Sequence, residues 1–424
     1  MKIIEELLQN VPLPRMVKVR QKFHAPEVSD VPAAVHQAIQ EAGVLSRIAK
    51  GDRVAIAVGS RGVADIPILV REVVNTVNSV GGEPFIVPAM GSHGGASAEG
   101  QTEVLEQLGV TESFIGAPIL SSMDVVEAGR LPNGLPVYVD KYAYEADKVI
   151  VINRIKPHTA FRGPVESGLM KMITIGLGKQ KGADAAHAYS FKYMAEHVPA
   201  MARITLSKVP IIFGLGTIEN AYDRPAKIVA VPAEKFEEIE PQLLLEAKAL
   251  MPRIMFDPID VLVVDEIGKN ISGDGMDPNI TGRYGTPYAS GGPQVNRIAV
   301  LGLTEKTHGN ANGIGLADVT TRKVFESIEW EKGYANALTS TVVSMVKLPM
   351  FLETEELAVK AAIKISNLFD LSKVRLVRIH NTLELENIWI SESLIPEARA
   401  NEDIEILTEP VPMHFSEHRY VDIS

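Results

Sequence analysis

Residues 154–181 reverse the charge of an otherwise acidic chain, whose formal net charge is −11. The segment contains one acidic residue, Glu166, and six basic ones: Arg154, Lys156, Arg162, Lys171, Lys179 and Lys181. Apolar residues such as Leu169 and Ile173 are interleaved with these charges, so part of the segment should be buried. Partly buried cations need anions to balance them. The segment therefore predicts a pocket for an anionic ligand.

Three side chains suited to acid–base or anion-binding chemistry each stand just beyond a short apolar run: Arg61, His93 and His158. An imidazole gains and loses a proton near neutral pH, and a guanidinium can bind both oxygens of a carboxylate. If the runs are neighbouring parallel strands, their carboxyl ends meet at one edge of a sheet, where ligands collect in α/β proteins. We therefore expect the three side chains to converge on one site.

The elements around these residues predict a strand–helix–strand order. Apolar runs at 53–58, 85–87 and 148–152 are typical of buried strands. Helices are expected between them, one following Asp65 and one capped by Ser97. Short loops in this order favour a mostly parallel sheet covered on both faces.

A second α/β pattern begins at about residue 260, after a Glu- and Leu-rich stretch at 232–252 that resembles a surface helix and linker. Its expected strands are 260–264, 298–301 and 374–379, and its expected helices lie within 319–328, 335–344 and 355–365.

The predicted fold class is thus α/β, with two α/β domains of mostly parallel sheets and an active-site cleft between them. We place the N-terminal catalytic domain at 1–252 and a smaller C-terminal domain at 253–386. The pattern leaves open whether the tail, 387–424, packs back on the first domain.

Composition excludes several classes of protein. The chain has 424 residues, 46% hydrophobic and 22% charged, as in ordinary globular proteins of two or three domains. The absence of cysteine excludes disulfides, thiolate nucleophiles and cysteine-ligated metal clusters. The negative net charge argues against affinity for nucleic acid or anionic membranes. Acidic residues near the start do not suit a signal peptide, and no apolar run approaches the roughly 18 residues of a membrane span. We expect a cytoplasmic protein that acts on small molecules.

Glycine-rich segments at 176–182 and 309–315 match neither the P-loop nor the GxGxxG pattern. The first could still hold a phosphate through backbone N–H groups, with Lys179 beside them. Among the histidines, His187 joins His93 and His158 as a candidate, and these three could in principle bind zinc. His308 is a weaker candidate, facing the cleft from the second domain.

The order and separations of these residues resemble the nickel-pincer lactate racemase family, whose members interconvert the stereoisomers of 2-hydroxy acids. The resemblance covers about residues 15–230, and the remainder agrees only in its general two-domain plan. Its motifs are Gly59-Ser60-Arg61, Gly91-Ser92-His93, His158, Lys171 in Gly168-Leu-Met-Lys-Met172, and His187 sixteen residues beyond that lysine.

The resemblance implies a cofactor, the nickel-pincer nucleotide (nickel pyridinium-3,5-bisthiocarboxylate mononucleotide). Lys171 would be joined covalently to it and His187 would be a nickel ligand. Its phosphate would lie near Gly91 and Ser92, with Lys179 as a further contact.

The resemblance also assigns the substrate chemistry. His93 and His158 would be the acid–base catalysts on either side of the substrate carbon, and Arg61 would hold the carboxylate. Removal of hydride while a histidine takes the hydroxyl proton gives a planar 2-keto acid, and hydride return to the other face inverts the centre. This route avoids removing the weakly acidic proton at C2.

The chain departs from the family pattern in two places. Three additional residues separate His158 from Lys171, which indicates a remodelled loop at 159–168. In the second domain the loop at 268–283 has its polar groups placed differently, with Lys269, Asn270, Asp274 and Arg283 as substrate-binding candidates. Such side chains could serve a larger hydroxylated acid, such as a sugar acid, in place of lactate.

Two other functions stay open. One is a zinc-dependent hydrolase using His93, His158 and His187. The other is a non-enzymatic protein that binds an anionic metabolite or a precursor of the cofactor. As partners we expect an anionic 2-hydroxy acid and the proteins that build the cofactor, but neither nucleic acid nor membrane; an oligomer is open.

Overall fold

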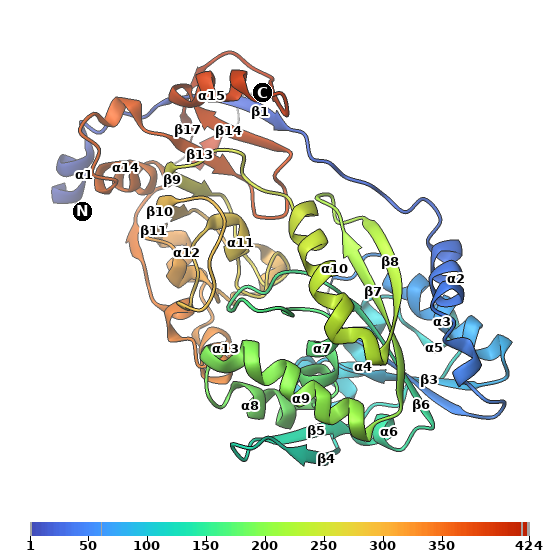
Figure 1. The fold of residues 1–424 in the computed structure, drawn as a ribbon. Helices are drawn as coiled ribbons and strands as arrows, with labels where there is room; N and C mark the ends of the chain where they lie inside the picture. Colours follow the sequence, from blue (N-terminus) through green and yellow to red (C-terminus); the bar gives the residue numbers. More distant parts are fainter. Residues whose placement is uncertain (1, 61, 417–418, 422–424) are drawn as a thin grey trace. The chain divides into compact units, whose positions relative to one another are not determined.

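The computed structural model describes residues 2–60, 62–416 and 419–421 (Figure 1). The chain forms two compact units. The central unit is His24–Met251, and the terminal unit joins the residues up to Phe23 to those from Pro252 onward. The predicted mixed α/β class with mostly parallel sheets is confirmed. The first 23 residues, however, were expected in the first domain and belong with the C-terminal part of the chain.

The sheet of the central unit has the strand order β3-β2-β6-β7-β8. Its strands are β2 (Arg53–Val58), β3 (Glu83–Pro88), β6 (Lys148–Arg154), β7 (Ile211–Glu219) and β8 (Pro225–Pro232). β3, β2, β6 and β7 pair in parallel, and β8 runs antiparallel to β7. The three predicted strands are therefore present and adjacent. A separate antiparallel hairpin consists of β4 (Val125–Arg130) and β5 (Pro136–Asp140).

The central unit has nine helices in its described residues, and α3, α4 and α10 lie where the sequence predicts. They are α2 (Val31–Ala42), α3 (Ile66–Ser79), α4 (Ala98–Gln107), α5 (Glu112–Ile115), α6 (Lys141–Tyr144), α7 (Leu169–Lys171), α8 (Lys179–His187), α9 (Met194–Lys208) and α10 (Phe236–Leu250). A π-helical turn, η3 (Met172–Gly176), continues α7, and a 3₁₀ turn, η4 (Phe191–Tyr193), precedes α9. Ser97 caps α4 by accepting the Gly100 N–H at 3.1 Å.

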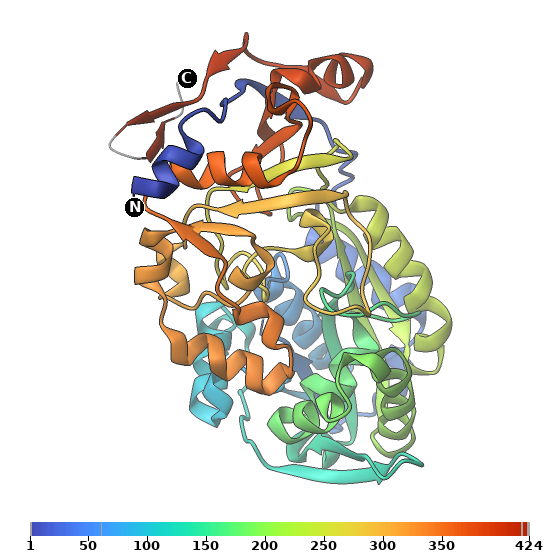
Figure 2. The same ribbon diagram turned by 90° about the vertical axis from the view of Figure 1, so that its left-hand side faces the viewer.

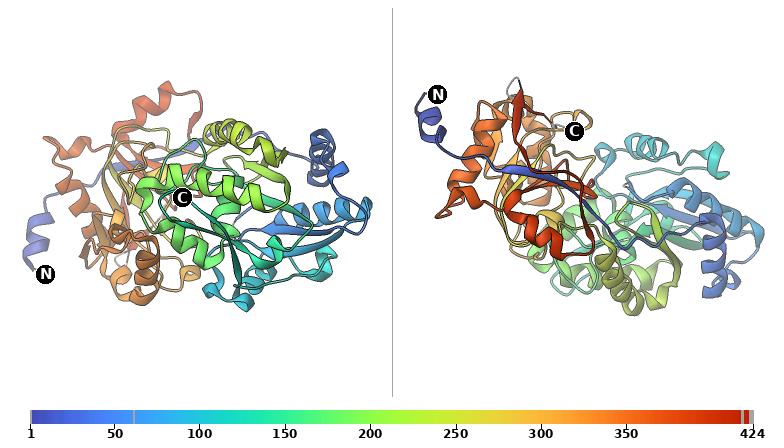
Figure 3. Two further views of the ribbon diagram at one scale, coloured as in Figure 1. Left: turned by 60° about the horizontal axis from the view of Figure 1, so that its bottom comes forward. Right: turned by 90° about the horizontal axis from the view of Figure 1, so that it is seen from above.

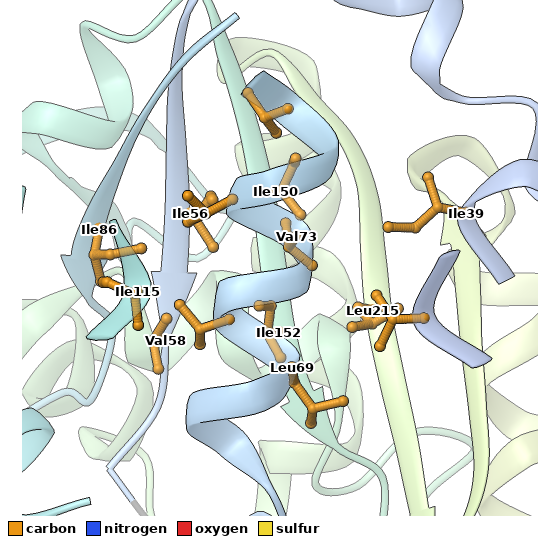
Figure 4. Close-up of a cluster of buried hydrophobic side chains, with 14 of the residues drawn as sticks. Ile39, Ile56, Val58, Leu69, Val73, Ile86, Ile115, Ile150, Ile152 and Leu215 are labelled. Carbon is orange, nitrogen blue, oxygen red and sulfur yellow. The ribbon is translucent and has the colours of Figure 1, made fainter. Parts of the chain in front are cut away.

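One face of the central sheet is covered by α3. Figure 4 shows Ile56 and Val58 of β2 with Ile150 of β6 beside Leu69 and Val73 of α3. These side chains are fully buried, so the sheet edge that carries the loops is anchored in a rigid apolar core.

The opposite face of β7 is lined by glycine, which allows a close approach. Phe213 and Leu215 belong to the core described above, whereas Gly214 points the other way because side chains alternate along a strand. A Cβ on Gly214 would lie 2.8 Å from Leu169 of α7 and 3.0 Å from Phe236 of α10. These two helices therefore pack directly on the strand backbone.

The terminal unit contains a sheet of order β12-β11-β10-β9-β13-β14-β1-β15, with β16 also paired to β1. Its strands are β1 (Arg15–Gln21), β9 (Ile259–Val264), β10 (Val295–Val300), β11 (Val319–Thr321), β12 (Met350–Leu352), β13 (Leu376–Ile379), β14 (Asn387–Ser391), β15 (Ile404–Ile406) and β16 (Val411–Pro412). β17 (His414–Ser416) and β18 (Arg419–Val421) pair with each other. The strands from β12 to β13 are parallel, and those from β14 to β15 are antiparallel.

The described part of the tail at 387–424 belongs to the terminal unit. Its first strand, β14, pairs with β13 on one side and with β1 on the other. Figure 3 shows the blue strand β1 running among the red C-terminal strands. The pairing satisfies backbone groups along both edges of β14, which holds the two ends of the chain in one sheet.

The helices of the terminal unit are α1 (Lys2–Leu8), α11 (Pro278–Thr281), α12 (Arg322–Ser327), α13 (Trp330–Ser340), α14 (Glu355–Ile365) and α15 (Ile395–Ala400). Figure 2 shows α1 beside α14, and both contribute to one apolar core. The helix expected within 319–328 is α12, and it follows a short strand that was not predicted. β-Branched Val319 and Thr320 form β11, and Thr321 caps α12 by accepting the Val324 N–H at 3.2 Å.

Nowhere in the described residues is there a helix long and apolar enough to cross a membrane.

Candidate active site

Loops from the carboxyl ends of β2, β3 and β6 meet at the π-helical turn η3. The N–H of Gly91, after β3, donates to the carbonyl of Gly176 at 3.2 Å. A Cβ on Gly59, after β2, would lie 3.2 Å from Met172 and 3.7 Å from Asn153 of β6. The loops after β2 and β3 therefore both reach η3 within the central unit, and the convergence of Arg61, His93 and His158 on one site stays a prediction. π-Helical turns are frequent at functional sites.

His93 is exposed on the loop after β3, and its Nδ1 forms a hydrogen bond with the hydroxyl of Ser60 on the loop after β2. This bond links the two loops and orients the imidazole. Arg61, the predicted carboxylate ligand, lies outside the described residues.

His158 is held by its own loop at three points. Its backbone N–H donates to Oε2 of Glu166 at 2.7 Å, and its Nδ1 accepts the Ala160 N–H at 3.0 Å. Its ring packs 4.6 Å from that of Phe161, centroid to centroid. Burial, followed by the positive charge of Lys171, holds the pKa of His158 well below its usual range. The imidazole is therefore neutral near pH 7, with its proton on Nε2.

His187 ends α8 and is oriented by its own helix. Its Nδ1 donates to the carbonyl of Ala183 at 2.7 Å, which leaves the lone pair of Nε2 available. Burial lowers the pKa of His187 despite the opposing effect of that carbonyl. Phe191 lies between the two histidines, with its ring 5.2 Å from His187 and 5.8 Å from His158.

Lys171 completes this group at the end of α7. Its charge lowers the pKa of both His158 and His187, so all three side chains lie near one another. Phe191 contacts both rings and was not identified from the sequence, where nothing distinguishes it from an ordinary core aromatic. The structure thus brings together one lysine and two neutral imidazoles beside an apolar wall.

Lys179 has a structural role, which corrects its prediction as a phosphate ligand. Its side chain is fully buried, and Nζ donates to Oε1 of Gln101 at 2.9 Å and to the carbonyl of Pro88. It also pairs with Asp140 at 3.2 Å. Burial lowers the pKa of Lys179 and raises that of Asp140, and each charge opposes the shift of the other. With these partners the ammonium group anchors the start of α8.

The Gly91–Ser92 turn was predicted to surround the phosphate. The N–H of Gly91 is already bonded to Gly176, and its carbonyl accepts from Gln101 at 2.9 Å. With φ at +59° this glycine adopts a left-handed conformation that other residues rarely accept. Gly91 therefore shapes the loop, while Ser92 is half-buried beside it and stays a predicted cofactor contact.

Arg283 of the terminal unit also differs from its prediction. Its guanidinium donates to the carbonyls of Asn296 at 2.8 Å and Leu316 at 3.1 Å, and it pairs with Asp318. These bonds tie together the starts of β10 and β11. With these partners the guanidinium of Arg283 stabilises the terminal unit and is not available as a substrate ligand.

Lys269 and Asn270 follow β9 and form bonds within their own unit. Nζ of Lys269 donates to the carbonyl of Gly273 at 2.7 Å, and Asn270 accepts from the Thr304 hydroxyl at 2.5 Å. His308 is exposed, and its carbonyl accepts from Lys332 at 2.7 Å. A role for Lys269 and Asn270 in binding substrate stays a prediction.

Within the described part of the chain, no three His, Asp or Glu side chains come together in a way that could hold a metal ion. The zinc reading of His93, His158 and His187 therefore gains no support from the geometry.

Three further residues near the site were not singled out as functional. Glu166 was noted only as the one acid in the basic segment, and it receives the His158 N–H. Glu240 and Lys248 lie on α10, in the stretch interpreted as a surface helix and linker. A glutamate four residues after Phe236, on the apolar stripe of that helix, is the signal that could have revealed Glu240.

The chain is similar to known proteins in part of its sequence and in its fold. Residues 5–198 match the family model of the lactate racemase N-terminal domain. The chain is similar to the lactate racemase apoprotein of Thermoanaerobacterium thermosaccharolyticum, with 11% identity, a TM-score of 0.49, and coverage of 87% of this chain and 99% of that one. It is also similar to a protein from Thermotoga maritima, with 12% identity, a TM-score of 0.50, and coverage of 84% and 99%. No curated protein matches the chain.

The fold and site define an α/β protein with a lysine and two histidines grouped in its central unit. The match of residues 5–198 to the lactate racemase N-terminal domain supports the resemblance found in the sequence.

Proposed function

We propose that this protein is an isomerase that racemises or epimerises a 2-hydroxy acid with the help of a nickel-pincer nucleotide. The observation that carries the proposal is the pair of His158 and His187 on either side of Phe191, with the charge of Lys171 acting on both, in the segment that matches the lactate racemase N-terminal domain.

The donor set suits such a cofactor. Lys171 would supply the amine for the covalent link, and His187 would bind nickel through Nε2, since its Nδ1 is committed to Ala183. A lowered pKa keeps this imidazole neutral, which metal binding requires. When bound, the cofactor would accept hydride from C2 of the substrate and return it.

The protein itself would handle protons and orientation. The Ala160 N–H bonded to Nδ1 of His158 leaves Nε2–H as the donor, so this ring can protonate or hydrogen-bond the oxygen at C2. His93 would exchange the proton on the other side of the substrate, with Ser60 orienting its ring. Arg61 would hold the carboxylate. That His93 and His158 flank one carbon remains a prediction.

The substrate class is a 2-hydroxy acid, and we propose a hydroxylated one such as a sugar acid. The support is the polar loop after β9, where Lys269 and Asn270 could meet additional hydroxyl groups. Because Arg283 is engaged elsewhere, this part of the proposal rests on fewer residues than the sequence indicated.

The test is to produce the chain in cells together with the proteins that build the cofactor. We propose that the protein acts in the cytoplasm, so cytoplasmic production is suitable. We expect nickel in the purified protein, a mass increment on Lys171 and racemisation of at least one 2-hydroxy acid from a panel. Lys171→Ala should abolish the increment, whereas Lys181→Ala, an exposed lysine of α8, should keep it.

Zinc with an unmodified chain would refute the proposal in favour of a hydrolase. Tight binding of an anionic metabolite without turnover, unaffected by His93→Ala or His158→Ala, would indicate a carrier. If lactate were the one acid of the panel that is racemised, the proposal of a sugar-acid substrate would be refuted and the proposed reaction would stand.

A further inference from the structure

The helix α10 has a polar residue where its pattern calls for an apolar one. Its buried face consists of Phe236, Glu240, Leu243, Leu244, Ala247 and Leu250. The side chain of Glu240 is therefore enclosed, with 1% of the residue exposed. A buried carboxyl group lowers stability unless its hydrogen bonds compensate, so its partners indicate its purpose.

Those partners are at the start of the helix that carries Lys171. Oε2 of Glu240 accepts the Met170 N–H at 2.9 Å, and the Leu169 N–H also donates to this carboxyl group. The residue before α7 is Gly168, which has no side chain to cap the helix. Glu240 thus provides from α10 the cap that α7 lacks.

The same helix holds the His158 loop near its other end. Nζ of Lys248 lies 2.7 Å from Oε1 of Glu166, whose side chain is fully buried. The other oxygen of Glu166 accepts the His158 N–H at 2.7 Å and contacts Arg162 at 3.3 Å. Arg162 in turn donates to the His158 carbonyl at 2.5 Å. Both backbone groups of His158 are therefore fixed through this network.

We propose that α10 is a positioning element for the site, holding the Lys171 helix through Glu240 and the His158 loop through Lys248. Eight residues of helix separate the two contacts, a rise of about 12 Å. This length of helix sets the spacing between Lys171, the proposed attachment point of the cofactor, and His158, the proposed acid–base residue. Figure 1 shows α10 passing α7, and the contact between these helices is direct.

Other polar links of α10 serve to attach it elsewhere. Glu246 pairs with Lys227 of β8 at 2.7 Å, and Glu237 pairs with Arg203 of α9 at 2.7 Å. Neither pair contacts the backbone of α7 or of the His158 loop. Glu246→Gln is therefore a matched control on the same helix.

The first test is amide hydrogen exchange of the protein without cofactor, which does not depend on the proposed function. Glu240→Leu should speed exchange in residues 169–172 by about tenfold or more and leave 156–162 unchanged. Lys248→Met should speed exchange in residues 156–162 and leave 169–172 unchanged. Glu246→Gln should change the exchange of neither segment. If Glu240→Leu does not fold, Glu240→Met serves instead, with the same expected result, because it also lacks an acceptor for the Met170 N–H. Glu240→Gln is the matched control for this position and should leave both segments unchanged, because its amide oxygen can still accept that N–H.

Equal loosening of both segments in each single variant would overturn the proposal, because it would show only a general loss of stability. Wild-type exchange rates in both variants would overturn it as well.

The second test rests on the proposed function. In protein made with the cofactor-building enzymes, Lys248→Met should keep the Lys171 mass increment and the KM but lower kcat by about tenfold or more. Lys248→Arg should restore kcat, because it keeps the charge beside Glu166. If the wild type carries no increment and has no racemase activity, the proposed function fails and the exchange result still decides the role of α10. If the wild type is active and Lys248→Met matches it, the positioning proposal fails alone.

Discussion

Replacement of Glu240 by glutamine should raise the free energy of unfolding of the central unit relative to the wild type. This gain should be larger at high pH than at low pH. Burial raises the pKa of Glu240 from its ordinary 4.5 to about 8, against the lowering effect of the Met170 and Leu169 N–H groups. Between these two values the folded chain holds the proton and the unfolded chain has released it. The free energy of unfolding therefore falls as pH rises through this window, by about 1.4 kcal/mol per pH unit.

Glutamine cannot ionise, so the Glu240→Gln variant lacks this slope while keeping an acceptor for both N–H groups. From pH 5 to pH 8 the variant should gain roughly 3 to 4 kcal/mol over the wild type. Well above pH 8 the difference should become constant, because Glu240 is then ionised in both the folded and the unfolded state.

The assay is the thermal midpoint of both proteins at pH 5, 6, 7 and 8 in one buffer series. For a unit of this length the gap in Tm should widen by roughly 6–16 °C over the range. Glu246→Gln, a half-exposed carboxylate of the same helix, should show a constant gap. A constant gap for Glu240→Gln as well would refute the reasoning, since it would mean that the two N–H groups outweigh burial and keep the carboxylate ionised.

Three other substitutions test particular assignments. Lys179→Met should lower the free energy of unfolding by about 3–5 kcal/mol, measured by chemical denaturation, because a carboxylate partner stays buried and uncompensated; a neutral effect would restore Lys179 as a ligand candidate. Gly168→Ala should lower Tm and displace α7, because its Cβ would lie 2.1 Å from Oε1 of Glu240; an unchanged Tm would contradict that close packing. Ser60→Ala should lower kcat while the lysine–cofactor mass increment persists, because the hydroxyl orients His93; unchanged kcat would show that the bond has no role.

The strands and loops of the central unit could be predicted because their signals are local. The apolar runs at 53–58 and 148–152 form β2 and β6 as expected, and the loops that follow them meet at one edge. In the terminal unit the helix expected within 319–328 is present as α12, but the strand that the β-branched residues at 319–321 form before it was not predicted.

Other features depended on partners distant in sequence. The position of the tail was left open because strand pairing is not encoded by either strand alone: β14 lies beside β1, more than 360 residues earlier in the chain. Lys179 and Arg283 were given ligand roles because their charges stood near glycine-rich loops. Their acceptors, among them Asp140 and Asp318, come from other segments and could not be identified from spacing.

The sequence by itself determined which residue types were available for chemistry: two histidines beyond strand ends, a lysine in a basic segment, and a third histidine sixteen residues after it. The order of those residues indicated the family whose N-terminal domain model matches residues 5–198. Only the tertiary structure decided the protonation of His158 and His187, because burial and the charge of Lys171 act through space. It also decided which charged groups are available and which are committed to the fold, since a charged side chain becomes structural once buried partners from distant segments surround it.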